Sequence, residues 1–97
     1  MSEENPANLA RIHIWVMGRV QGVGFRAFVM QVGSLLGLVG WVHNLGYDQV
    51  EVVAEGSRPV LERFSEVVRT GPRASRVESA HMEWETPKGE FDRFTVK

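Results

Sequence analysis

The sequence contains no cysteine among its 97 residues, which excludes a disulfide framework, a thiolate nucleophile and a cysteine-ligated zinc site. It also has almost no net charge, because 11 Lys and Arg residues are balanced by 12 Asp and Glu residues. A balanced chain has no general attraction for nucleic acid or for an anionic membrane surface. Any anion-binding site in this protein must therefore be formed locally.

Long apolar runs are absent as well, since no stretch approaches the roughly 18 apolar residues that a transmembrane helix needs. Residues 1–6 are acidic and polar, whereas a secretory signal begins with positive charge and continues with an apolar run. We therefore expect a cytoplasmic protein without a membrane partner. A chain of 97 residues is long enough for one modest core, and hence for one domain.

What the sequence does contain is a clear succession of apolar periodicities. Residues 1–9 offer little to bury and predict a disordered tail, followed by one domain over residues 10–97. Alternation with a period of two predicts strands, and helical spacing predicts helices. The expected strands cover residues 11–17, 39–44, 49–55, 76–85 and 91–96, and the expected helices cover residues 25–36 and 59–70. A break in the alternation predicts a β-bulge near Glu78 or Ser79.

The order of these elements limits the fold. Each expected strand has one aliphatic face, and each helix has a single apolar stripe. A two-layer α+β sandwich, with both helices on one face of an antiparallel sheet, buries all of these surfaces at once. The last short strand is an addition to a β-α-β-β-α-β unit.

Residues 18–26 form a glycine-rich segment, GRVQGVGFR, between the first strand and the first helix. Its three glycines allow the backbone to approach a ligand and to turn successive N–H groups inward. A helix N-terminus adds unpaired N–H groups and a partial positive charge, so the segment is suited to phosphate. Arg26 lies in the first helical turn beside it. On spacing alone, a tight turn with a solvated arginine remains an equal alternative.

Two familiar nucleotide-binding motifs do not match this segment. The Rossmann fingerprint requires G-x-G-x-x-G within a longer α/β unit, and a P-loop requires Lys-Ser or Lys-Thr after its last glycine. The residues around Gly22 and Gly24 provide neither pattern. Nucleotide binding is therefore not expected.

Residues 18–26, followed by GWVHN at residues 40–44, resemble the acylphosphatase family. The likeness extends over nearly the whole chain, and two motifs at this separation are highly specific. The resemblance implies a ferredoxin-like fold and the hydrolysis of a carboxyl phosphate to a carboxylate and inorganic phosphate. It implies no metal, no cofactor and no covalent intermediate. The expected partners are a small acyl phosphate as substrate and inorganic phosphate as product and competitive inhibitor, and the expected state is a monomer.

The resemblance also implies roles for particular residues. Arg26 matches the family's phosphate-binding arginine, and Asn44 matches its water-orienting asparagine. The remaining phosphate contacts would come from the loop amides of Gln21, Gly22, Val23, Gly24, Phe25 and Arg26. His43 and Leu45 depart from the commoner family pattern, and we expect any effect of theirs to fall on substrate preference. The alternation of the second strand independently supports placing Asn44 near Arg26. Asn44 shares a face with Gly40 and Val42, and the helices should cover that face.

A non-catalytic binding module for RNA or for a protein partner is the alternative function. Trp15 and Trp41 are expected on the sheet face away from the helices, where related folds stack RNA bases. Glu51 and Glu55 share that face and argue against nucleic acid. Trp15 and Trp41, with Val39 and Val53, could also form a subunit interface or be scattered surface residues. The three histidines, His13, His43 and His81, are irregularly spaced and are expected on the surface rather than in a metal site.

Overall fold

The computed structural model describes residues 8–97, which form one five-stranded sheet and two helices. The strands are β1 (Leu9–Arg19), β2 (Val39–Leu45), β3 (Gln49–Ser57), β4 (Arg76–Glu85) and β5 (Phe94–Val96). The helices are α1 (Phe25–Leu35) and α2 (Arg58–Thr70). Most of the predicted tail, residues 1–7, lies outside the described residues, and Leu9 already belongs to β1.

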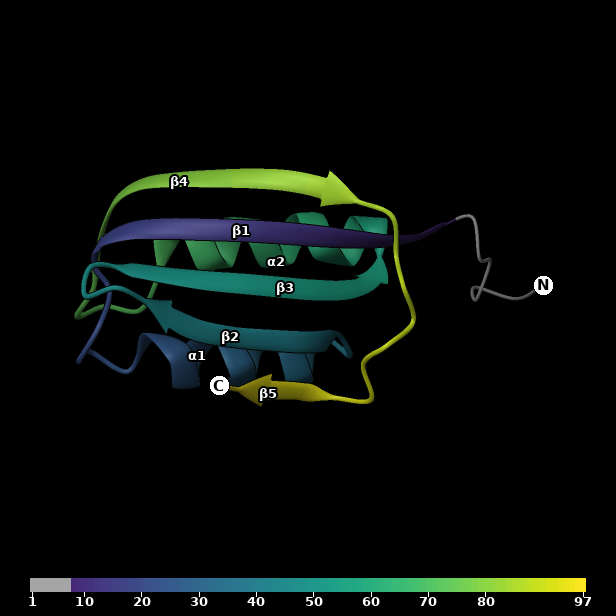
Figure 1. The fold of residues 1–97 in the computed structure, drawn as a ribbon, viewed down its shortest axis with the longest axis horizontal. Coiled ribbons are helices and arrows are strands. Elements are labelled where there is room, and N and C mark those ends of the chain that lie inside the picture. Colours follow the sequence, from purple (N-terminus) through teal and green to yellow (C-terminus); the bar gives the residue numbers. More distant parts are fainter. Residues whose placement is uncertain (1–7) are drawn as a thin grey trace.

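The strands lie in the order β4-β1-β3-β2-β5, with both helices behind one face of the sheet (Figure 1). The α+β class and the single helical layer are as predicted. The fully antiparallel sheet is wrong, because β2 and β5 pair in parallel. The chain leaves β4 at the end of the sheet where β2 begins, crosses along that end, and so enters β5 in the direction of β2.

The core lies between the sheet and the two helices. Aliphatic side chains from the helix-facing side of β1 and β3 are fully buried there, as are Phe25 and Val29 of α1 and Leu61 and Phe64 of α2. Helix α1 also packs closely on β5. A Cβ added at Gly33 would lie 2.6 Å from the Phe94 ring, so this helix can approach the edge strand only because residue 33 has no side chain.

Two local details of the sheet can be compared with the predictions. Met17 pairs with Ser79 and Gly18 pairs with Val77, so Glu78 is an extra residue in β4 and the predicted bulge is confirmed. Strand β5 is shorter than predicted, since it begins at Phe94 rather than at residue 91.

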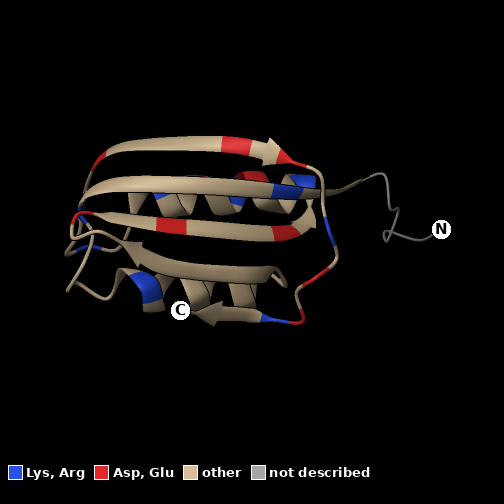
Figure 2. Ribbon diagram, viewed as in Figure 1, with Lys and Arg blue, Asp and Glu red and all other residues tan. Residues whose placement is uncertain are grey.

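The face of the sheet opposite the helices differs from expectation at two residues, His13 and Val53. His13 was expected on the surface, but its side chain is only 17% exposed and contacts Glu51 through Nε2 and Glu85 through Nδ1. Val53 is 1% exposed, because His13 and Trp41 pair with it on the neighbouring strands. Figure 2 shows the acidic positions on the central strand β3 and on β4. Within residues 8–97, neither helix is long and apolar enough to span a bilayer.

Candidate active site

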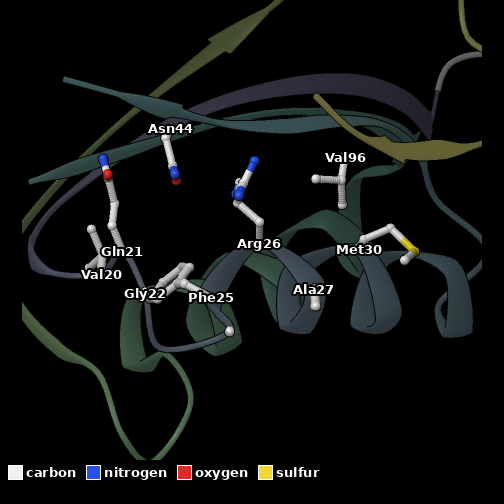
Figure 3. A pocket seen from close by; sticks show the side chains of 10 residues that line it. Val20, Gln21, Gly22, Phe25, Arg26, Ala27, Met30, Asn44 and Val96 are labelled. Carbon is white, nitrogen blue, oxygen red and sulfur yellow. The ribbon is translucent and has the colours of Figure 1, made fainter. Parts of the chain in front are cut away.

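The predicted site residues surround one pocket of about 260 Å³ at the N-terminus of α1. Gln21, Gly22, Gly24, Phe25, Arg26 and Asn44 all line it, and Val23 is the one predicted phosphate contact that does not. Figure 3 shows Asn44 and Arg26 pointing into the same space, from β2 on one side and from α1 on the other. The strand parity therefore predicted correctly that these two residues lie together.

The glycine-rich segment leads into the N-terminus of α1 without providing a side-chain cap. Gly22 and Gly24 have φ angles of 72° and 77°, a left-handed conformation that side chains with a Cβ rarely adopt. Gly24 is the N-cap of α1; among the described residues no side chain caps this helix and its first turn has no acidic residue. The first N–H groups of α1 are therefore available to an anion, which the helix dipole also favours.

Arg26 contacts the residue that follows the edge strand β5. Its Nη1 donates a hydrogen bond to the main-chain oxygen of Lys97 at 3.0 Å. Within residues 8–97 no acidic side chain forms an ion pair with it. A guanidinium group has five donors in a planar fork, so one bond to Lys97 leaves most of them for a ligand.

Asn44 has a buried side-chain oxygen that lacks a hydrogen-bond partner within residues 8–97. It lies near the end of β2, on the same face as the fully buried Val42. Its Oδ1 atom is buried, yet it has no hydrogen-bond partner in the described part of the chain. A buried acceptor without a partner costs free energy, so this oxygen is suited to a donor that enters the pocket.

The side chain of Gln21 is a structural element of the site that the sequence motif did not predict, because the motif implied a role only for its main-chain amide. Its Nε2 donates to the carbonyl oxygens of Gly46 at 3.0 Å and Gln49 at 2.9 Å. The main-chain N–H of Gly18 also donates to the carbonyl of Asp48 at 2.9 Å. The glycine-rich segment is thus attached to the turn that follows Asn44.

The two departures from the family pattern lie outside this pocket. Neither His43 nor Leu45 lines it, and His43 instead contacts Glu51 through Nε2 on the opposite face of the sheet. In residues 8–97 no group of three or more His, Cys, Asp or Glu side chains is placed to hold a metal ion.

Comparisons with known proteins agree with this architecture. The family model described as Acylphosphatase matches residues 12–96. An acylphosphatase from Trichormus variabilis is 45% identical over 83 residues, which are 86% of this chain and 82% of the relative.

Two solved structures are similar as well. The structure of an acylphosphatase from Coxiella burnetii has a TM-score of 0.90 at 33% identity and covers 99% of this chain and 100% of its own. The crystal structure of acylphosphatase from Bacillus subtilis has a TM-score of 0.86 at 36% identity, covering 91% of this chain and 98% of its own. The chain belongs to the acylphosphatase family.

Proposed function

We propose that this protein hydrolyses acyl phosphates to a carboxylate and inorganic phosphate in the pocket at the N-terminus of α1. The observation that carries the proposal is the arrangement around that pocket, where an uncapped helix end, the Arg26 guanidinium and the unpartnered Asn44 Oδ1 face one space. Together they match two requirements of phosphoryl transfer, which are stabilisation of charge on the phosphoryl oxygens and orientation of the attacking water.

The phosphoryl group would bind at the glycine-rich segment. Its oxygens would accept hydrogen bonds from the main-chain N–H groups of residues 21–26, and two of them would meet the fork of Arg26. Charge on these oxygens must be stabilised as the bond to the leaving group breaks, which is the largest task in phosphoryl transfer. Arginine suits this task better than lysine, because its donors are planar and can bind two oxygens.

Asn44 would orient the attacking water. Its Oδ1 accepts a hydrogen bond from the water, which places the water oxygen for attack on phosphorus. The bond between phosphorus and the acyl oxygen then breaks, and the electron pair leaves with the carboxylate. A carboxylate is a weak base and departs without a proton, so the reaction needs no general acid at the leaving oxygen. The proton released by the water passes to phosphate or to solvent.

Release of inorganic phosphate from benzoyl phosphate tests this function directly. We expect turnover that is unchanged by a chelator such as EDTA, because the proposed chemistry uses only protein donors. Inorganic phosphate should inhibit competitively, since product and substrate share the same loop. Loss of turnover with EDTA and its return with a divalent ion would contradict the proposed mechanism. An absence of any turnover would instead favour a non-catalytic binding module.

A further inference from the structure

The pocket continues beyond Arg26 into an apolar end that the proposed phosphate chemistry does not use. Met30 lies one helical turn after Arg26 on α1. Val96 directly precedes Lys97, whose main-chain oxygen accepts the hydrogen bond from Arg26. Both line the same pocket as Asn44. Figure 3 shows Met30 on the α1 side and Val96 on the β5 side of the same space, with Arg26 between this pair and Asn44.

This apolar end has no charge to pair with a second anionic group. Among the described residues that line the pocket, Arg26 alone is charged. The side chain of Lys97 lies elsewhere, because its Nζ is 4.4 Å from the centre of the Trp41 ring on the other sheet face. A carboxylate placed beside Met30 and Val96 would lose water without gaining a partner, whereas an apolar group would gain from burial.

We propose that Met30 and Val96 form the acyl subsite and select acyl phosphates whose acyl group is apolar and uncharged. This inference rests on the proposed function. The pocket volume of about 260 Å³ suits a small substrate. The flexible Met30 side chain can adapt to acyl groups of different shape.

A matched pair of substrates tests the charge selection. Benzoyl phosphate and 4-carboxybenzoyl phosphate differ by one remote carboxylate, and we expect kcat/KM to favour benzoyl phosphate by about tenfold or more. Met30→Lys supplies the missing cation and should shift this ratio toward the carboxylated substrate by about tenfold. Leu35→Lys is the control, because it adds the same charge to α1 at a residue that is 81% exposed and outside the pocket. An equal shift in both variants would overturn the proposal.

Two milder variants test the apolar contact. In Met30→Ser and in Val96→Ser, the ratio of kcat/KM for benzoyl phosphate to that for acetyl phosphate should fall about fivefold to tenfold. The inhibition constant of inorganic phosphate should stay within about twofold, because the phosphoryl end is unchanged. If Met30→Ser does not fold, Val96→Ser still provides the same ratio of kcat/KM values. Parallel losses on both substrates in the folded variants would overturn the subsite and leave the proposed function standing. No hydrolysis by the parent protein would overturn both.

Discussion

Gln21 joins the two halves of the site through a single amide nitrogen. Its Nε2 donates to Gly46 and Gln49, and these residues flank the turn that follows Asn44. Together with the hydrogen bond from the Gly18 N–H to the Asp48 carbonyl, this contact links the glycine-rich segment to the turn after β2 and helps to position Asn44 relative to Arg26. Small displacements of catalytic groups have large effects on rate, so Gln21 is a positioning residue in this account.

Replacing this amide with a carboxylate should lower turnover. Gln21→Glu keeps the side-chain shape but removes both donors and sets a carboxylate against two carbonyl oxygens. We expect kcat on benzoyl phosphate to fall about tenfold or more. Gln49→Ala is the matched control, since Gln49 contributes only its main-chain carbonyl to this contact. Equal kcat values for Gln21→Glu and the parent would show that the connection has no role in catalysis.

The proximity of Arg26 and Asn44 was predictable from the sequence, whereas the contact made by the Gln21 side chain was not. Strand parity placed Asn44 on the helix-covered face, and the glycine segment placed Arg26 at the start of the covering helix. The Gln21 side chain bonds to main-chain carbonyl oxygens, which every residue has, so its partners leave no mark in the sequence. The apolar Met30 and Val96 were also missed, because their shared pocket depends on where β5 packs.

The packing of α1 on β5 depends on Gly33. Glycine inside a helix normally lowers its stability relative to alanine by roughly 0.5–1 kcal/mol. Here an alanine Cβ would lie 2.6 Å from two ring carbons of Phe94, and that ring is itself buried. At this position, the cost of a clash with Phe94 is therefore larger than the gain in helix propensity from alanine.

Gly33→Ala should consequently destabilise the protein, against the usual trend for this substitution. We expect the free energy of unfolding to fall by about 1–3 kcal/mol, the usual cost of overpacking. Urea unfolding followed by circular dichroism measures it. Gln31→Ala, on the exposed side of the same helix, should change the value by less than about 0.5 kcal/mol. A stabilising effect of Gly33→Ala would mean that α1 and β5 are not packed so closely.

The helices and four of the strands were predicted to within a few residues because each has its own apolar periodicity. Strand β5 is the exception in both length and direction. Its direction is set by the path of residues 86–93 around one end of the sheet, and its position by contacts of Phe94 with Gly33 and Phe64. These are long-range contacts, which a local pattern does not encode.

Across the whole molecule, the face of the sheet away from the pocket carries a network of charged and histidine side chains. His13 and His43 both contact Glu51, His13 also contacts Glu85, and Arg11 bonds to Glu85 and to the buried Glu55. These residues come from β1, β2, β3 and β4. The sequence did not predict the network, because strand order and register bring together residues that are up to 74 positions apart.

The carboxylates of this network have lowered pKa values. Burial alone would raise the pKa of Glu51, but hydrogen bonds from His43 and His13 outweigh it, and the pKa lies below its ordinary value of 4.5. The pKa of Glu85 is lowered chiefly by its hydrogen bond to His13. A carboxylate whose pKa is lower when folded stabilises the protein fully above its ordinary pKa, and this contribution is lost as pH falls through the folded value.

Unfolding should therefore become easier below about pH 4.5, and Glu51→Gln should weaken this dependence. Urea midpoints measured between pH 7 and pH 3 give the comparison. The variant should be less stable than the parent at pH 7, because it removes a charged partner from His13 and His43, but its stability should fall less steeply in acid. Glu78→Gln, at an exposed position, is the control. Parallel pH profiles for the parent and Glu51→Gln would contradict the role of this carboxylate.

The proposed roles of Arg26 and Asn44 can be separated by comparing Arg26→Ala with Asn44→Ala in turnover on benzoyl phosphate and in the inhibition constant of inorganic phosphate. Arg26→Ala should lose about 10³-fold or more in turnover and should also bind phosphate more weakly, because the proposed mechanism has the guanidinium contact the phosphoryl group throughout the reaction. Asn44→Ala should lose about 10²-fold to 10³-fold in turnover but keep the phosphate affinity of the parent, because the proposed role of Asn44 is to orient only the water. Circular dichroism should show both variants folded. Parent turnover in Asn44→Ala, or parent phosphate affinity in Arg26→Ala, would contradict the account.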